Sequence, residues 1–203
     1  MALNFANNNS LSAITSLPTS ISGGGMTLIS TQTASSSSTI SFTSGIDSTY
    51  DEYVFKLYDI HPASDNVSFQ FNLSIDGGSN YNVVKTSTVF QNYHNEADNS
   101  AGQFYHTSND LAQSTSPQIL IGNGGVGADN DQSYAGTLTL FAPSSTTFVK
   151  HYMAVSNTYQ YDNYSMNDFV AGYGNTTSAI NSVQFSMSSG NIDSGVIKLY
   201  GIS

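Results

Sequence analysis

Strict alternation of apolar and polar side chains is the strongest pattern in the chain, and it runs through NVSFQFNLSI at residues 66–75. The apolar positions are Val67, Phe69, Phe71, Leu73 and Ile75. A period of two predicts a strand with one face in a core and the other in water. The DGGSN that follows, at residues 76–80, is rich in turn formers and is expected to end this strand.

Other segments repeat this pattern or form short apolar runs between turn residues. Alternation recurs in TISFT (39–43) and SVQFSM (182–187), while YAGTLTLFA (134–142) and TFVKHYMAV (147–155) flank a turn-rich linker that suits a hairpin. No long stretch has the 3.6-residue period of an amphipathic helix. We therefore predict an all-β domain of about eight to ten strands with turns spaced as in sandwiches.

Two longer segments lack either period and are rich in Asp, Asn and Gly. They span residues 94–117 and 122–133. Residues of these types favour turns over strands, so we interpret both segments as loops.

Two segments far apart in the sequence are nearly identical: VFKLYDI at residues 54–60 and VIKLYGI at residues 196–202. We predict that both segments are strands of one sheet. The two strands being direct neighbours in that sheet is one arrangement consistent with this prediction. Lys56 and Lys198 are expected to lay their stems on apolar surface and keep their charges in water. Lys150 has a similar context, and lysines within strands discourage edge-to-edge pairing.

The first 25 residues differ from the rest, because their apolar residues are sparse and a Gly triplet follows. We predict an arm and hinge over residues 1–25, ahead of a β-sandwich over residues 26–203. The alternative is a first strand with a frayed terminus. In the arm interpretation, the partner-binding side chains are Leu3, Phe5, Leu11, Ile14, Leu17 and Ile21.

Charge narrows the classes of partner. Fourteen acidic residues stand against four lysines, there is no arginine, and the formal net charge is −10. Such a chain repels phosphate backbones and anionic lipid head groups, so we exclude nucleic-acid and membrane-surface binding. There is no cysteine for disulfides or thiolate chemistry. Residues 1–22 lack the pattern of a secretory signal, and no apolar stretch is long enough to span a bilayer.

One cluster resembles a transition-metal site. His94, Glu96 and Asp98 alternate, which would place them on one face of a strand, and His106 follows. Their surroundings are typical of a solvated loop, so we predict no metal here. The GADND segment (127–131) has two aspartates spaced as in calcium loops, but it lacks the remaining ligands of an EF-hand.

Enzyme motifs are missing as well. GNGGVG (122–127) has no Lys-Ser or Lys-Thr after it and fails as a phosphate loop. There is no GxSxG. Of the two glutamates, Glu52 lies beside Tyr53, but this position fits the start of a strand better than the buried setting of a glycosidase acid. We predict a protein that is not an enzyme and uses no cofactor.

The best candidate for surface recognition is NTYQYDNYSMNDF at residues 157–169. Its Tyr159, Tyr161 and Tyr164 alternate with amides and an aspartate. Tyrosine offers a large, stiff, amphipathic contact area that suits protein interfaces and sugar faces. The competing interpretation is a strand whose tyrosines cap the core.

The opening MALNFANNNSLSAITSLP, the middle DEYVFKLYDIHP and FQFNLSIDGGSNY, and the terminal SGNIDSGVIKLYGIS together resemble small structural proteins of marine tailed bacteriophages. The resemblance covers most of the chain. It implies a non-enzymatic virion component, assembled in the host cytoplasm, with a jelly-roll-like antiparallel β-sandwich and a homo-oligomeric, trimeric state. Its implied partners are other capsid or tail subunits.

Within that family we expect a capsid decoration or head-associated protein anchored through its N-terminal arm. One alternative is a tail-fibre or adsorption component that uses the Tyr-rich segment against a host surface glycan. Another is a carbohydrate-binding module that uses the same tyrosines, with or without calcium.

Overall fold

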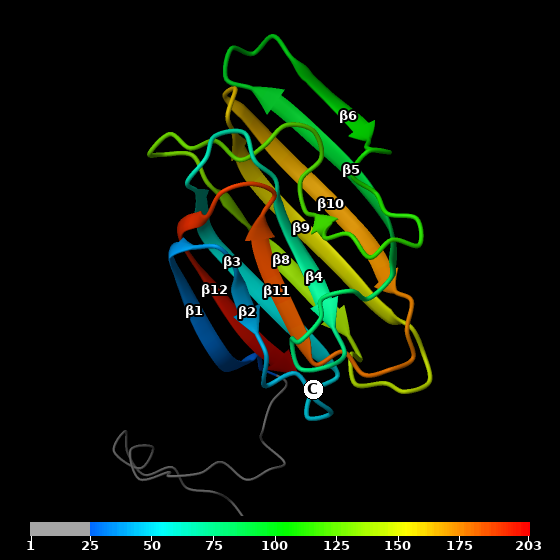
Figure 1. The fold of residues 1–203 in the computed structure, drawn as a ribbon. Helices are drawn as coiled ribbons and strands as arrows, with labels where there is room; N and C mark the ends of the chain where they lie inside the picture. Colours follow the sequence, from blue (N-terminus) through cyan, green and yellow to red (C-terminus); the bar gives the residue numbers. More distant parts are fainter. Residues whose placement is uncertain (1–24) are drawn as a thin grey trace, which may run out of the picture.

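Twelve β-strands lie within residues 25–203, which are the residues that the computed structural model describes. They form two stacked antiparallel sheets, and no helix occurs in this part of the chain (Figure 1). The predicted all-β sandwich is confirmed, with more strands than expected. The jelly-roll connectivity stays a prediction, and all six proposed arm residues lie outside the described residues.

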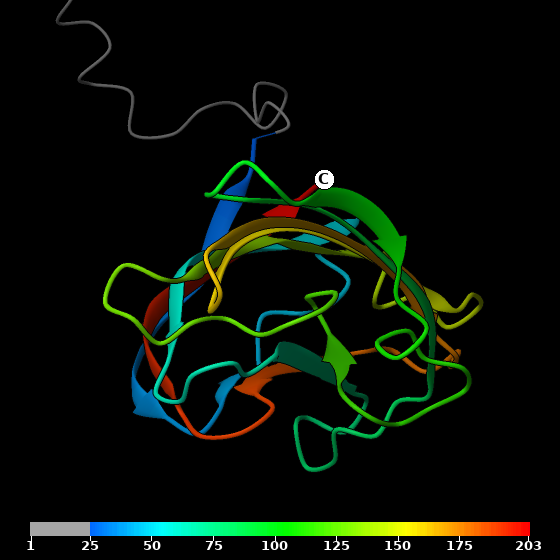
Figure 2. The ribbon, with the colours of Figure 1, turned by 90° about the horizontal axis from the view of Figure 1, so that it is seen from above.

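The sheets are of unequal size. The large sheet has eight strands in the order β1 (Thr27–Ser37), β12 (Ile192–Ile202), β3 (Glu52–Pro62), β8 (Tyr134–Phe141), β9 (Lys150–Gln160), β10 (Tyr164–Gly174), β5 (Lys85–Asn95) and β6 (Ala101–Tyr105). The small sheet has four, in the order β2 (Ile40–Phe42), β11 (Ser182–Met187), β4 (Phe69–Ser74) and β7 (Gln118–Ile119). The large sheet curves over the small one, so it has a concave inner face and a convex outer face (Figure 2).

The core lies between the sheets and is centred on the ring of Phe185. This ring stacks on Phe69 at 5.7 Å and meets Phe55 of the large sheet edge-on at 5.3 Å. Phe42 and Phe71 lie within 6.4 Å of it. The alternating patterns of β2, β4 and β11 place these rings inward, as the sequence predicted, and their burial is the main stabilising contribution to the sandwich.

The two KLY segments are adjacent strands, β3 and β12, and they pair with Lys56 directly opposite Lys198. Both lysines lie on the convex face. Lys56 Nζ donates to Thr137 Oγ1 at 3.1 Å, and Lys198 Nζ lies 5.6 Å from the centre of the Tyr58 ring. The predicted common sheet is confirmed. The edge-protection interpretation is wrong, because β3 and β12 are interior strands and the edge strands β1 and β6 contain no lysine.

Lys150 does not keep its charge in water. It is buried where β9 begins, and its Nζ donates to the carbonyls of Phe148 at 2.6 Å and Thr176 at 3.3 Å. Lys85 is also buried, and its Nζ donates to Asn72 Oδ1 and to the carbonyl of Val83 at 2.9 Å. Burial lowers the pKa of Lys85 to about 8 and also lowers that of Lys150. Hydrogen bonds to carbonyls and an amide take the place of water here.

The strand predicted from the alternation at residues 66–75 is wrong at its C-terminal end. The strand stops at Ser74 and the turn begins there, so Ile75 is 42% exposed instead of lying in the core. Asn72 and Ser74, expected in water, are buried. Asn72 Nδ2 donates to the carbonyls of Tyr81 at 2.7 Å and Thr115 at 3.1 Å, because a long connection packs over this side of β4.

The long segment from residue 106 to residue 133 lies against the concave face of the large sheet, beside the small sheet (Figure 2). It contains only the short β7, so the loop interpretation of residues 122–133 is confirmed, whereas residues 94–117 include the end of β5 and all of β6. Buried contacts hold the segment to the sheet. Tyr152 Oη donates to Gln118 Oε1 at 3.0 Å, and both side chains are fully buried.

Candidate binding site

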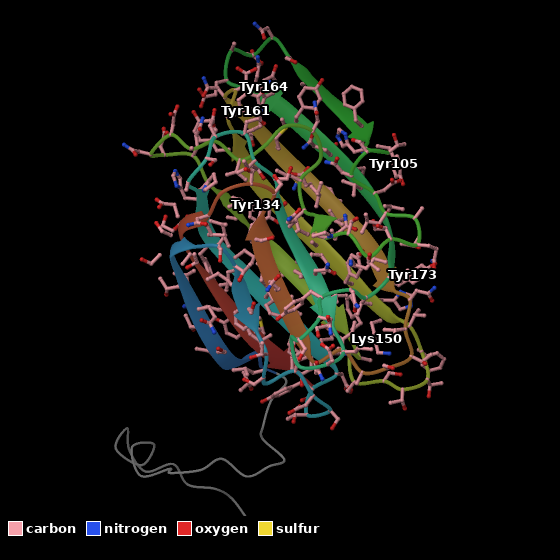
Figure 3. The ribbon with its side chains drawn as sticks, viewed as in Figure 1. Tyr105, Tyr134, Lys150, Tyr161, Tyr164 and Tyr173 are labelled. Atoms are coloured by element: carbon pink, nitrogen blue, oxygen red, sulfur yellow. The ribbon has the colours of Figure 1, made fainter. Side chains whose placement is uncertain are left out.

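A three-residue hairpin loop positions two of the predicted tyrosines. Gln160 of β9 pairs with Tyr164 of β10, and residues 161–163 connect them. Asn163 has a φ of 60° and its N–H donates to the Gln160 carbonyl at 3.0 Å. Asparagine adopts this left-handed conformation more readily than most residues, which favours a turn at YDN. The turn leaves Tyr161 and Tyr164 close together at the end of the hairpin (Figure 3).

The neighbouring β5–β6 hairpin supplies two more rings on the same face. Tyr93 of β5 stacks on Phe104 of β6 with centroids 5.7 Å apart and an interplanar angle of 7°. Tyr93 also meets Tyr164 edge-on at 5.7 Å, so the rings of the two hairpins are continuous. Gly102 lies opposite Tyr93, where a Cβ would be 2.9 Å from the phenol oxygen. A side chain at residue 102 would therefore displace the Tyr93 ring.

These rings and nearby amides surround a hollow of about 440 Å³, which we name the aromatic pocket. Phe104 and Tyr161 are its most accessible rings, at 53% and 38% exposure. The pocket has no lysine among its described lining residues. Its lining consists of Gln91, Tyr93, Ser100, Phe104, His106, Asn123, Gln160, Tyr161, Asp162, Tyr164 and Met166.

A buried carboxylate lies beneath the floor of the pocket. Asp168 is 0% exposed, and its Oδ1 accepts hydrogen bonds from Gln91 Nε2 and from the N–H of Gly122, both at 2.7 Å. Burial raises the pKa of Asp168 to about 7, although both hydrogen bonds favour the ionised form. Within the described residues, Asp168 Oδ2 has no hydrogen-bond partner.

Gly122 allows this floor to close. A Cβ at this residue would lie 2.6 Å from His106 Cδ2 and 2.8 Å from Gln91 Cδ. His106 and Gln91 can therefore approach the backbone only because residue 122 lacks a side chain. Burial lowers the pKa of His106, so its imidazole favours the neutral form.

The predicted recognition tyrosines do not form one surface. Tyr161 and Tyr164 line the aromatic pocket, whereas Tyr159 lines a separate groove of about 290 Å³ with His94 and Glu96. Strand alternation places Tyr159 on the convex side of β9 and Tyr164 on the concave side of β10, whereas Tyr161 lies in the turn between the two strands. The Glu96 carboxylate raises the pKa of Tyr159, mainly because it accepts a hydrogen bond from the phenol.

The histidine and acidic side chains that resemble a metal site in the sequence do not come together. Residues 96–99 form the turn after β5, and Asp98 has a φ of 54°, so the expected strand alternation of His94, Glu96 and Asp98 ends at Asn95. His94 Nε2 lies 3.1 Å from Asp98 Oδ1. His106 instead lines the aromatic pocket.

The aspartates of GADND lie elsewhere. Asp131 lines a polar hollow of about 360 Å³ with Asp59, His61 and Asp193. The carbonyl of Asp129 lies 3.2 Å from His61 Nε2. Within residues 25–203, no group of three or more His, Asp or Glu side chains is arranged to hold a metal ion.

Sequence reasoning missed Tyr93, Phe104, Gln91 and Asp168. The sequence did contain a signal for the part of the pocket lined by Phe104 and His106. These two residues alternate in GQFYH, and a strand there would place both on one face. The pairing of β5 with β10, which brings Gln91 opposite Asp168, has no local signal.

No family model matches the chain, and no similar curated protein or solved structure was found. Among residues 25–203 there is also no helix long and apolar enough to cross a membrane.

Proposed function

We propose that this protein is a non-enzymatic virion structural protein of a tailed bacteriophage that recognises a glycan through its aromatic pocket. The observation that carries the recognition role is the pocket itself, where exposed aromatic rings meet amide and carboxylate groups. The phage assignment rests on the family resemblance of the sequence. Together they favour an adsorption role over decoration of the capsid.

The pocket has the two features that sugar recognition requires. The apolar C–H face of a pyranose packs on an aromatic ring, and Phe104 and Tyr161 expose rings of that kind. The hydroxyl groups of a sugar need hydrogen-bond partners at fixed positions, and Gln160, Asp162 and Asn123 supply them around the rings.

The lining favours binding over cleavage. Glycoside hydrolysis usually requires two carboxyl groups that flank the scissile bond. Asp162 is the single carboxylate among the described lining residues, and Asp168 lies buried beneath the floor. A bound sugar would therefore meet one carboxylate and no partner acid.

A glycan array with neutral and anionic oligosaccharides tests this proposal. We expect the purified protein to bind a subset of glycans, and Phe104→Ala or Tyr161→Ala to weaken binding at least tenfold, about 1.4 kcal/mol. Phe148→Ala is the matched control, because Phe148 is 71% exposed outside the pocket and should not contribute. Binding that survives both pocket substitutions, or the absence of binding to every glycan, would contradict the proposal.

The convex face favours a second role, contact with a neighbouring virion protein. Val155, Phe169, Phe90 and Tyr105 are partners in one row across β9, β10, β5 and β6. Phe90 and Phe169 stack at 4.8 Å. Across these strands and β8 the sole carboxylate is Asp168, which points inward. An apolar, charge-depleted patch on an acidic protein is typical of an interface centre.

Particle assembly tests this second role. Phe90→Ser removes the central ring of the row, and we expect incorporation of the protein into phage particles to fall, since the patch loses its largest contact. Phe148→Ser is the control for loss of an exposed phenylalanine. Equal incorporation of the Phe90→Ser variant and the native protein would contradict the proposed role of the convex face in assembly.

A further inference from the structure

The orientation of one amide decides what the floor of the aromatic pocket offers to a ligand. Gln91 lines the pocket although it is 1% exposed, so its side chain is fixed by its neighbours. Its Nε2 donates to Asp168 Oδ1 at 2.7 Å. Its Oε1 is turned to the other side, where the N–H of Asn123 approaches it at 3.4 Å. That long contact leaves the carbonyl oxygen with capacity to accept another hydrogen bond.

Asp168 sets this orientation, since an ionised carboxylate only accepts hydrogen bonds and therefore selects the NH₂ end of Gln91. The N–H of Gly122 donates to the same Oδ1 at 2.7 Å, which fixes the carboxylate against the loop that forms part of the floor. In the strand register Asp168 lies opposite Gln91 on β5 and opposite Ser156 on β9. Hydrogen bonds from Gln91 on β5 and from the loop N–H of Gly122 thus hold the carboxylate.

We infer that Asp168 is a positioning residue that turns the Gln91 carbonyl toward the aromatic pocket, so that the pocket selects uncharged, hydroxyl-rich sugars and rejects anionic ones. This inference rests on the proposed glycan-binding function and adds the class of ligand. A sugar hydroxyl can donate to Gln91 Oε1, whereas a sugar carboxylate or sulfate brings only acceptors. Asp162 at the pocket and the lack of lysine among the described lining residues act in the same direction.

Protonation of Asp168 would release the amide. A neutral carboxyl group can donate its proton to Gln91 Oε1, which then allows the amide to turn and present NH₂ to the pocket. Because burial places the pKa of Asp168 at about 7, this change is expected within the neutral range. Binding of a neutral sugar should therefore be stronger at pH 8 than at pH 6, by about three- to tenfold for one hydrogen bond.

The other groups near Asp168 are few. Burial raises the pKa of the Tyr134 phenol on β8, and the Asp168 carboxylate raises it further, so Tyr134 stays protonated throughout this range. His106 lies next to Gly122 and Gln91, the two residues that donate hydrogen bonds to Asp168. Ser156 and Thr158 of β9 contribute hydroxyls that do not titrate here. Among these titratable neighbours only His106 can imitate the pH effect, and it therefore needs a control.

The first measurement needs no ligand. In protein with ¹⁵N-labelled glutamine, the side-chain amide signal of Gln91 should shift with pH around neutrality. Asp168→Asn should abolish that shift, whereas His106→Asn should retain it. A Gln91 signal that does not respond between pH 5 and pH 8, or that responds equally in Asp168→Asn, would overturn the inference whether or not any sugar binds.

The second measurement uses maltohexaose, laminarihexaose and cellohexaose as neutral probes and hexaguluronate as the anionic probe. We expect binding of a neutral probe that strengthens from pH 6 to pH 8 in the native protein and loses this dependence in Asp168→Asn. Gln91→Ala provides a second variant and should weaken neutral binding without pH dependence. Preference for hexaguluronate would overturn the inference. Failure of all four probes and of every glycan on the array, with the Gln91 shift intact, would contradict the glycan function while leaving the Asp168–Gln91 link in place.

Discussion

The buried carboxylate of Asp168 makes the stability of this fold depend on pH in a direction opposite to that of most acidic groups. Its pKa is raised from the ordinary 3.8 to about 7, so the folded state retains a proton that the unfolded chain has released. Stability is therefore highest when Asp168 is protonated and falls as the pH rises from about 4 toward 7. Above the folded pKa the loss is complete and constant.

The size of the effect follows from the shift. A difference of about three pK units corresponds to about 4 kcal/mol in total, at about 1.4 kcal/mol for each unit. Most of this falls between pH 5 and pH 8, where the native protein should lose about 3 kcal/mol relative to a variant that cannot ionise. Asp168→Asn is that variant, because its amide oxygen can still accept from Gln91 Nε2 and from Gly122 N–H.

Urea denaturation of both proteins at pH 5, 6, 7 and 8 measures this difference. Far-ultraviolet circular dichroism or tyrosine fluorescence can follow it, since the chain has 13 tyrosines and no tryptophan. Other groups that titrate in this range, such as His106, are common to both proteins and cancel in the comparison. We expect the stability of Asp168→Asn relative to the native protein to rise with pH. A constant difference would refute the assignment of a raised pKa to Asp168, and a falling one would refute its sign.

Two further substitutions test the core and the pocket floor. Phe185→Ala removes the ring on which Phe42, Phe55, Phe69 and Phe71 converge. Urea denaturation should show that the free energy of unfolding falls by about 3–5 kcal/mol. A loss under about 1 kcal/mol would contradict the central place of this ring. Gly122→Ala introduces a Cβ within 2.8 Å of His106 and Gln91. It should lower the melting temperature and shift the side-chain amide signal of Gln91. An unchanged Gln91 signal would show that the pocket floor has room for the added methyl group.

The sequence predicted strands and their core residues well wherever one face of a strand is buried. Alternation in NVSFQFNLSI and SVQFSM identified β4 and β11 and most of their core residues, because burial of one face follows from local pattern alone. The two KLY segments were correctly placed in one sheet. Their direct pairing, with Lys56 opposite Lys198, depends on strand order, which a single sequence specifies only through long-range packing.

The sequence was misleading where tertiary contacts replace water. Lys150 and Asn72 were expected at a wet surface, yet each finds carbonyl acceptors inside the sandwich. Buried polar groups of this kind are tolerated when they are hydrogen-bonded, and the partners come from segments distant in sequence. The same reason explains why Asp168 and Gln91, brought together by β5 and β10, had no sequence signal.

The candidate site was half visible in the sequence. NTYQYDNYSMNDF drew attention to Tyr161 and Tyr164, and its turn chemistry accounts for their position. Tyr159 was assigned to the same surface, although the period of two places it on the opposite face from the pocket residues on β9 and β10. Applying strand alternation across the hairpin would have separated Tyr159 from Tyr164, whereas Tyr161 lies in the turn and reaches the pocket from there.

The most direct test of glycan recognition is nuclear magnetic resonance of protein with ¹³C-labelled phenylalanine and tyrosine rings, titrated with the neutral glycan that binds best on the array. The pocket geometry predicts shifts at Phe104 and Tyr161 and none at Phe148, which lies outside the pocket. Shifts that leave Phe104 and Tyr161 unchanged while moving rings elsewhere, such as Phe90 or Tyr105 on the convex face, would contradict the account.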